Sequence, residues 1–265
     1  MKINISIAQL EILNDNFDKN VDKSLYLIDQ LGFQENHILL MPELWSTGYT
    51  SKLIEAAKFN FELINCLKEK STEKKIIICG SYILQDENNH FHNRLIVIYP
   101  EIGPIAKYDK TKLFHQMNEH NLFSPGNKLC SVKLFDQIFG LSICYDLRFP
   151  EIYRQYSQFK TQFHLVPMQW PLIRIDQLNK LIIARAIENQ AYFISANSIG
   201  LSGNTEFGGN SKIIDFMGNI VLDMENLVDE IRSAKLDTDP LERWRNDFPV
   251  LNDLGEFHYM DSEQK

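Results

Sequence analysis

Residues 139–151 read Phe-Gly-Leu-Ser-Ile-Cys-Tyr-Asp-Leu-Arg-Phe-Pro-Glu, a short apolar run followed by a polar elbow. The pattern predicts a strand that ends before Cys144 and a helix whose first turn holds Pro150 and Glu151, because proline and acidic residues suit that turn. In layered α/β folds, ligand clefts open at the carboxyl ends of strands. Cys144 is therefore either a thiol that a substrate can reach or a buried cysteine that fills apolar space, as most free cysteines do.

The composition is that of an ordinary globular protein. The chain has 265 residues, 44% of them hydrophobic and 23% charged, which fits one large domain better than two. With 27 basic and 35 acidic residues the net charge is −8, which argues against binding to nucleic acid. Residues 1–10 alternate like a half-buried strand, without the apolar centre of a signal peptide. No run approaches the ~20 apolar residues of a membrane span, so we expect a cytoplasmic protein without membrane contact.

The cysteines give little sign of metal or redox chemistry. Cys66, Cys79, Cys130 and Cys144 form no C-x-x-C pair, which argues against a zinc ribbon or a thioredoxin-type centre. Disulfides are not expected in a reducing compartment. Cys66 lies in a helical pattern and Cys79 in an apolar run, so both are expected in the core, while Cys130 follows a Pro-Gly turn. Only Cys144 combines a strand end with a polar elbow.

Strands alternate with helices along the chain, which predicts an α/β fold with helices covering the faces of a sheet. One predicted helix ends near residue 31 with Gly32 as its C-cap. We expect a single domain over residues 1–236 and a tail over 237–265. Apolar residues in that tail are expected to dock on the domain or on a partner copy; they are Trp244, Phe248, Leu251, Phe257 and Tyr259.

Two other residues with useful chemistry directly follow predicted strands. Glu43 follows the strand 37–41, and its apolar neighbours would raise its pKa toward the range of a general base, unless it simply points to water. Lys110 follows a predicted hairpin strand, within a lysine cluster that by default is a solvated face. The polar stretch 115–126 shows no clear period and is expected to be a loop that covers something.

A thiol nucleophile needs a base and a donor for the oxyanion that it creates. Seven histidines are available, but none heads a recognisable thiol-protease signature. The other candidate set is Glu43, Lys110 and Cys144, which a folded sheet could bring to one rim.

Three motifs that contain these residues resemble the Glu-Lys-Cys motifs of the nitrilase superfamily, the carbon–nitrogen hydrolases. They read Met-Pro-Glu-Leu-Trp at 41–45, Tyr-Asp-Lys-Thr-Lys-Leu-Phe at 108–114 and Cys-Tyr-Asp-Leu-Arg-Phe-Pro at 144–150. Ala-Arg-Ala-Ile-Glu-Asn-Gln-Ala-Tyr at 184–192 is a further match, and the order agrees along roughly residues 1–235.

Within that superfamily the chain is most similar to the omega-amidase branch, which includes the bacterial YafV-like proteins. This closer likeness rests on the 144–150 motif, on Asn-Glu-His at 118–120, on Trp-Pro at 170–171 and on the tail 248–257.

The resemblance implies a four-layer α-β-β-α sandwich that commonly forms dimers. It implies Cys144 as nucleophile, Glu43 as general base and Lys110 as a stabiliser of the oxyanion. Glu119 would be a second acid that positions the base and the substrate, and the main-chain N–H of Tyr145 would complete the oxyanion site. A nearby ammonium favours a thiolate, so this set is chemically coherent. It needs no metal and no organic cofactor.

Three further residues are candidates for substrate contact. Phe114 and Trp170 are expected either to wall the pocket or to be ordinary core residues. Arg148 would meet a substrate carboxylate, or would form a structural ion pair with Asp146.

The implied function is a thiol amidase that uses water to release ammonia from a small amide, with 2-oxoglutaramate or 2-oxosuccinamate as the best guess. The chain departs from the branch at Thr111-Lys112, Gln169 and Asn197-Ser198, where Arg-His, Asn and Asn-Arg are expected. These changes remove cations that could face an acidic substrate. N-carbamoyl compounds and nitriles remain alternative substrates, and a non-catalytic binding protein remains an alternative of another class. The expected assembly is a homodimer or a larger homo-oligomer.

Overall fold

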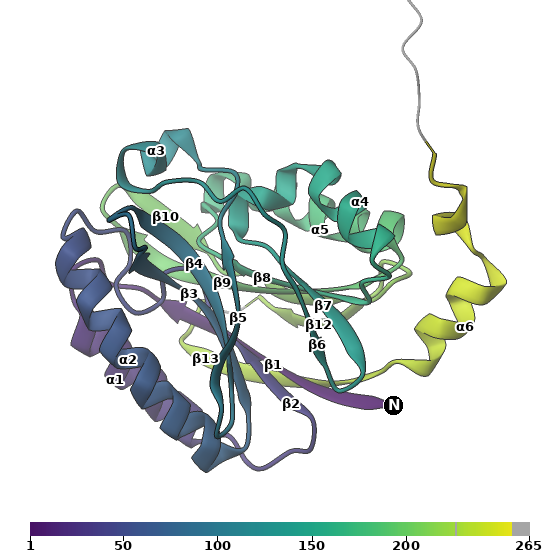
Figure 1. Ribbon diagram of the computed structural model, residues 1–265, viewed down its shortest axis with the longest axis horizontal. Coiled ribbons are helices and arrows are strands. Elements are labelled where there is room, and N and C mark those ends of the chain that lie inside the picture. The colour runs from purple at the N-terminus through teal and green to yellow at the C-terminus, as the bar shows by residue number, and fades with distance from the viewer. Residues whose placement is uncertain (226, 256–265) are drawn as a thin grey trace, which may run out of the picture.

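The computed structural model describes residues 1–225 and 227–255, which form two packed β-sheets between two layers of helices (Figure 1). Parallel strands build the centre of the first sheet, and antiparallel strands extend both of its edges. Its strands, in order across the sheet, are β5 (Gly103–Asp109), β4 (Phe91–Tyr99), β3 (Ile77–Gln85), β2 (His37–Leu40), β1 (Lys2–Glu11) and β13 (Glu230–Asp237).

The second sheet again has parallel strands at its centre and antiparallel strands at its edges. Its strands are β6 (Ser131–Leu134), β7 (Gln137–Leu141), β8 (Phe163–Met168), β9 (Tyr192–Ser202), β10 (Thr205–Gly208), β11 (Ser211–Ile214) and β12 (Ile220–Met224). The end of β1 pairs with β9 at Leu10 and Ser198, which joins the two sheets into one hydrogen-bonded system.

Helices cover the outer face of each sheet. In Figure 1, α1 (Phe17–Asp29) and α2 (Leu53–Lys74) lie outside the first sheet, and α4 (Pro150–Gln158) and α5 (Ile175–Asn189) lie outside the second. This arrangement confirms the α/β fold that the sequence pattern predicts and the four layers, α-β-β-α, that the family resemblance implies.

Side chains of β1 alternate between the two faces of the sheet, so this one strand contributes to two apolar cores. Ile3, Ile5 and Ile7 belong to the core that contains residues of both sheets, whereas Ala8 and Leu10 belong to the core beneath α1 and α2. Successive side chains of a strand point to opposite faces, so an apolar strand can support both layers at once.

Two local predictions are wrong. Gly32 is not the C-cap of the first helix: α1 already ends at Asp29, and Gln30 caps it in a right-handed conformation by donating to carbonyls of the last turn. The stretch 115–126 is more than a loop, because it contains a 3₁₀ turn η1 (His115–Met117) and a short helix α3 (Glu119–Leu122). Periodicity cannot reveal such single turns.

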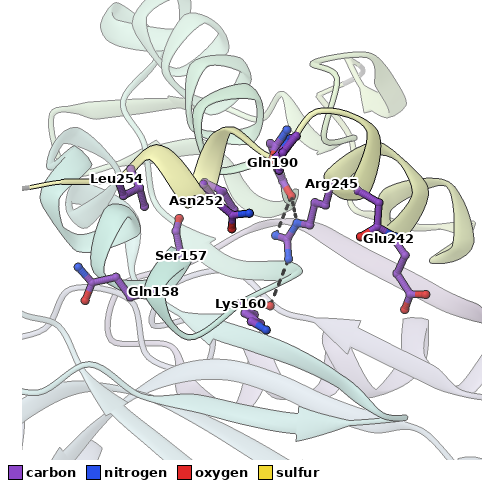
Figure 2. Close-up of a pocket in the computed structure, with 11 residues that line it drawn as sticks. Ser157, Gln158, Lys160, Gln190, Glu242, Arg245, Asn252 and Leu254 are labelled. Carbon is purple, nitrogen blue, oxygen red and sulfur yellow. Dashed lines mark hydrogen bonds between the residues drawn. The ribbon is translucent and has the colours of Figure 1, made fainter.

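After β13 the chain forms α6 (Asp239–Asp247) and a 3₁₀ turn η4 (Val250–Asp253), which lie against α4 and the end of α5 (Figure 2). Arg245 fastens this segment, because its guanidinium donates to the main-chain carbonyls of Gln190 at 2.7 Å and Thr161 at 2.6 Å. Burial lowers the pKa of Arg245 to about 10. The Trp244 ring packs against Phe216, with ring centroids 6.5 Å apart.

The division into a domain over 1–236 and a tail over 237–265 stays a prediction. Of the tail residues expected to dock, Phe257 and Tyr259 lie outside the described residues. Among the helices that are described, none has both the length and the apolar character needed to cross a bilayer.

Arg245→Met is expected to lower the free energy of unfolding by about 2 kcal/mol, because buried carbonyls would lose a charged donor. Urea unfolding followed by circular dichroism measures this change. Arg243→Met, at an exposed position of the same helix, is the matched control and is expected to change stability by less than about 0.5 kcal/mol. Equal effects of the two substitutions would show that Arg245 does not fasten the segment.

Candidate active site

A buried lysine between two buried carboxylates forms the centre of the candidate site. Lys110 Nζ donates to Glu43 Oε1 at 2.7 Å and to Glu119 Oε1 at 2.6 Å, and all three side chains are 0% exposed. Glu43 follows β2, Lys110 follows β5 and Glu119 begins α3. Lys110 therefore does not belong to a solvated face, the default for its cluster, although Lys107 and Lys112 are exposed.

Glu43 is held by polar groups from three other elements. Its Oε1 also accepts from Asn93 Nδ2 at 2.7 Å, and its Oε2 accepts from the main-chain N–H of Gln169 at 2.9 Å. The side-chain amide of Gln169 donates to the main-chain carbonyl of Glu43 at 2.8 Å. These contacts fix both oxygens of the carboxylate, one toward Lys110 and one toward the end of β8.

Glu119 is fixed in a similar way. Tyr49 Oη donates to Glu119 Oε1 at 2.5 Å, and the main-chain N–H of Phe114 donates to Oε2 at 2.8 Å. Burial raises the pKa of Tyr49 well above its usual value, and the charges of Glu119 and Glu43 raise it further. Tyr49 is therefore a neutral donor in this site.

Burial and charge act in opposite directions on the ionisable groups. Burial raises the pKa of Glu43, the Lys110 charge opposes that rise and the Glu119 charge adds to it. For Lys110, burial alone would lower the pKa, but the charges of Glu119 and Glu43 outweigh it, so the pKa is raised. Lys110 is thus a permanent ammonium held by two carboxylates.

Cys144 lies where β7 turns into the 3₁₀ turn η2 (Cys144–Arg148), as the sequence predicts, and Pro150 begins α4. Its backbone has a φ of 45°, a left-handed conformation that is strained for a residue with a side chain and is concentrated at functional sites. The residue is only 6% exposed.

The Cys144 thiol lies beside the buried carboxylate. The two side chains are near enough to act on each other's pKa: the Cys144 thiol lowers the pKa of Glu43, and the Glu43 charge raises that of Cys144. Burial raises the pKa of Cys144 well above its usual value, the Glu43 charge raises it further and the Lys110 charge lowers it. At neutral pH the resting Cys144 side chain is therefore a thiol and not a thiolate.

Asp146 fastens the elbow to the end of β5. It is fully buried, and its carboxylate accepts from the main-chain N–H groups of Ile143 and Lys112, both at 2.9 Å. The hydroxyls of Tyr108 and Thr111 also donate to it, at 2.8 and 3.0 Å. One aspartate therefore holds the segment that carries Lys110 against the segment that carries Cys144.

A small cavity opens at Cys144. Phe114, Trp170 and Arg148, the three residues expected at a pocket wall, all line it, together with Tyr145. The rings of Phe114 and Tyr145 lie 4.8 Å apart. The ion pair between Arg148 and Asp146 that the sequence suggests is absent from the described residues, because Asp146 is occupied by four other donors.

The structure thus brings Glu43, Lys110, Glu119 and Cys144 together. Sequence reasoning missed five residues of this region: Tyr49, Asn93, Asp146, the main chain of Gln169, and Arg174, which lines the cavity. Asn93 stands between His92 and Arg94 in the sequence, so no pattern singled it out. Cys66 was misassigned to the core: it lies exposed on α2, whereas Cys79 is buried as expected.

The described part of the chain contains no candidate metal site. Over residues 1–225 and 227–255, no group of three or more His, Cys, Asp or Glu side chains is arranged to hold a metal ion. A second cavity lies between α4, α5 and the C-terminal segment (Figure 2), but the donors of its Arg245 are directed to main-chain carbonyls.

Comparison with known proteins gives consistent matches. The family model described as "Carbon-nitrogen hydrolase" matches residues 4–246. A 2-oxoglutaramate amidase from Bacillus subtilis is 31% identical over 96% of this chain and 98% of its own length. Omega-amidase YafV from Yersinia enterocolitica is 31% identical over 84% and 86% of the two chains. The crystal structure of a CN-hydrolase superfamily protein from Xanthomonas campestris superposes with a TM-score of 0.90 at 24% identity, covering 98% of this chain and all of that one.

Asp146→Asn is expected to lower the free energy of unfolding by about 3 kcal/mol, because the new amide nitrogen would face two donors inside the protein. Urea unfolding measures the loss. Asp136→Asn is the control: Asp136 forms an exposed ion pair with Lys133, and such pairs contribute at most about 1 kcal/mol. If both variants unfold at the same urea concentration, Asp146 does not fasten the elbow.

Proposed function

The chain belongs to the carbon–nitrogen hydrolase family, and we propose that it is an omega-amidase that hydrolyses 2-oxoglutaramate or a similar monoamide of a 2-oxo dicarboxylic acid. The observation that supports this most directly is a thiol at a strained elbow, beside a buried carboxylate and a buried ammonium, at the base of a small cavity. The names of the relatives, 2-oxoglutaramate amidase and omega-amidase, supply the substrate class.

In the proposed first half-reaction, Cys144 Sγ attacks the amide carbonyl while Glu43 takes the thiol proton. Burial supports this role of Glu43, because a carboxylate with a raised pKa is a better base. Lys110 and the main-chain N–H of Tyr145 stabilise the tetrahedral oxyanion. Glu43 returns the proton to the leaving nitrogen, so ammonia departs and a thioester remains on Cys144.

In the proposed second half-reaction, water replaces ammonia. Glu43 takes a proton from the water, which attacks the thioester carbonyl, and the same two donors, Lys110 and the main-chain N–H of Tyr145, stabilise the second oxyanion. Collapse releases the carboxylic acid, and the proton on Glu43 returns to the sulfur. The sum is an amide and water converted to an acid and ammonia, with enzyme and proton restored.

Glu119 and Tyr49 act in this scheme through Lys110. Glu119 accepts from the ammonium at 2.6 Å and so keeps Nζ aimed at the reacting centre, and Tyr49 keeps that carboxylate in place. Phe114 and Trp170 form the apolar wall against which a small amide packs.

We propose a homodimer as the assembly and the cytoplasm as the compartment. Exposed apolar side chains lie on and near the helices that cover the second sheet, and they support self-association. They are Phe159, Ile187 and Phe248. All four cysteines are free, which fits a reducing compartment.

Cys144→Ala is expected to reduce ammonia release from 2-oxoglutaramate at least about 10⁴-fold, since the nucleophile is lost. Coupled glutamate dehydrogenase or direct ammonia detection measures it, and the melting temperature checks that the fold is intact. Cys66→Ala, at an exposed cysteine, is the control and should keep full activity. Undiminished turnover by the Cys144→Ala protein would refute the proposal. Release of carbon dioxide from an N-carbamoyl amino acid, with no turnover of 2-oxoglutaramate by the unmodified protein, would instead indicate an N-carbamoyl substrate.

The fall of kcat/KM at low pH, its acid limb, is expected to have its midpoint above pH 4.3, the usual pKa of a glutamate. Burial raises the pKa of Glu43, and this base works only when it is ionised. Activity should therefore fall as the pH drops through that raised pKa. Initial rates between pH 4 and pH 9 measure the limb. Glu43→Gln should lower kcat/KM about 10³-fold and remove the limb. An unchanged limb in this variant would assign it to another group.

A further inference from the structure

Two arginines reach the cavity of Cys144 from different turns of the chain. Arg148 ends η2, and Arg174 ends the 3₁₀ turn η3 (Leu172–Arg174), which directly follows Trp170 and Pro171. Both line the cavity with Cys144, and both are partly exposed. We propose that Arg148 and Arg174 together form a carboxylate-binding site that holds the acidic end of the substrate while its amide end meets Cys144. This inference rests on the proposed amidase function and names the residues that select its substrate.

Neither guanidinium has an anionic partner among the described residues. Arg148 donates to the side-chain carbonyl of Gln177 at 2.7 Å, and Arg174 donates to that of Gln116. Three other arginines in the described part of the chain do have a carboxylate partner: Arg94 pairs with Asp109, Arg185 with Glu188 and Arg232 with Glu230. Two cations that share a cavity without a carboxylate are suited to bind one from outside, because guanidinium and carboxylate groups match in geometry and charge.

Aromatic rings hold both guanidinium groups in place. Arg148 lies over the Trp170 ring, 4.8 Å from its centroid, and Arg174 lies over the Phe114 ring at 5.7 Å. Both rings line the same cavity. Stacking on aromatic faces leaves the N–H edges of a guanidinium free to bind, and it limits the entropy lost when a ligand is bound.

The charge of the inner site makes such cations necessary for an acidic substrate. Glu43 and Glu119 carry two negative charges against the single positive charge of Lys110, which both of them already bind. The chain as a whole carries −8. A carboxylate that approached Cys144 without compensation would be repelled, whereas the arginine pair supplies two positive charges at the cavity wall.

The omega-amidase branch is expected to have an arginine where this chain has Ser198, and the arginine pair at the cavity supplies positive charge in its place. The Ser198 side chain is fully buried in β9, and the neighbouring Asn197 is occupied by the main-chain N–H of Trp170 at 2.7 Å. The loss of an arginine at 198 therefore does not leave the cavity without positive charge.

A pair of substrates that differ only in the acidic group tests the proposal. 2-Oxoglutaramate carries a carboxylate where 4-oxopentanamide carries a methyl group, and both present the same amide. Arg148→Gln and Arg174→Gln should each lower kcat/KM for 2-oxoglutaramate about 10- to 100-fold, mainly through KM, and leave kcat/KM for 4-oxopentanamide within about 3-fold. Arg174→Lys should recover part of the loss. Arg243→Gln, at an exposed position on α6, is the control and should alter neither substrate.

Calorimetric binding of 2-oxoglutaramate to the Cys144→Ala protein gives a second readout that needs no turnover. Each arginine substitution in that background should weaken binding by the same 10- to 100-fold factor. Equal losses for the two substrates, or no loss in Kd, would overturn the carboxylate site while leaving the amidase function standing. Absence of ammonia release from either substrate by the unmodified protein, together with arginine-dependent binding, would instead reject the amidase function and retain the site.

Discussion

The ammonium of Lys110, held between the carboxylates of Glu43 and Glu119 and closed off from water, is the interaction on which the site depends. A lone buried charge costs several kcal/mol, so none of the three groups could lie there without the others. Because they come from the ends of β2 and β5 and the start of α3, their pairing fixes three separate segments relative to one another. The same contacts leave Glu43 beside the thiol of Cys144, poised to exchange a proton with it.

The two joined sheets explain why these segments meet. Strands β2 and β3 run parallel to β1, and β7 and β8 run parallel to β9, so the ends that carry Glu43 and Cys144 point toward the line where β1 and β9 join. Asp146 then ties the two halves at short range by taking donors from both. The inner site is built mainly from residues that follow strands, whereas part of the cavity wall comes from short turns, where Arg148 and Arg174 lie.

Local sequence pattern was enough to predict much of this fold, and its failures have a common cause. The strand before Cys144, the elbow and the proline that begins α4 follow from residues adjacent in sequence. Residues that depend on distant partners could not be placed. Lys110, for example, is buried because its ammonium pairs with the carboxylate of Glu43, 67 residues away. Likewise, an exposed cysteine and a core cysteine look alike in a helical pattern, as Cys66 demonstrates. Motif resemblance supplied the convergence of Glu43, Lys110 and Cys144, which periodicity alone left open.

The central claim is that the thiol beside this buried ion group carries the acyl part of the substrate during turnover. Rapid acid quench of the protein within the first turnover of 2-oxoglutaramate, followed by peptide mass spectrometry, tests it most directly. We predict a transient adduct on the peptide that contains Cys144, with a mass increase equal to the substrate less ammonia. Release of a full equivalent of ammonia with that peptide unmodified at every sampled time, or with the acyl group on another residue, would contradict the account.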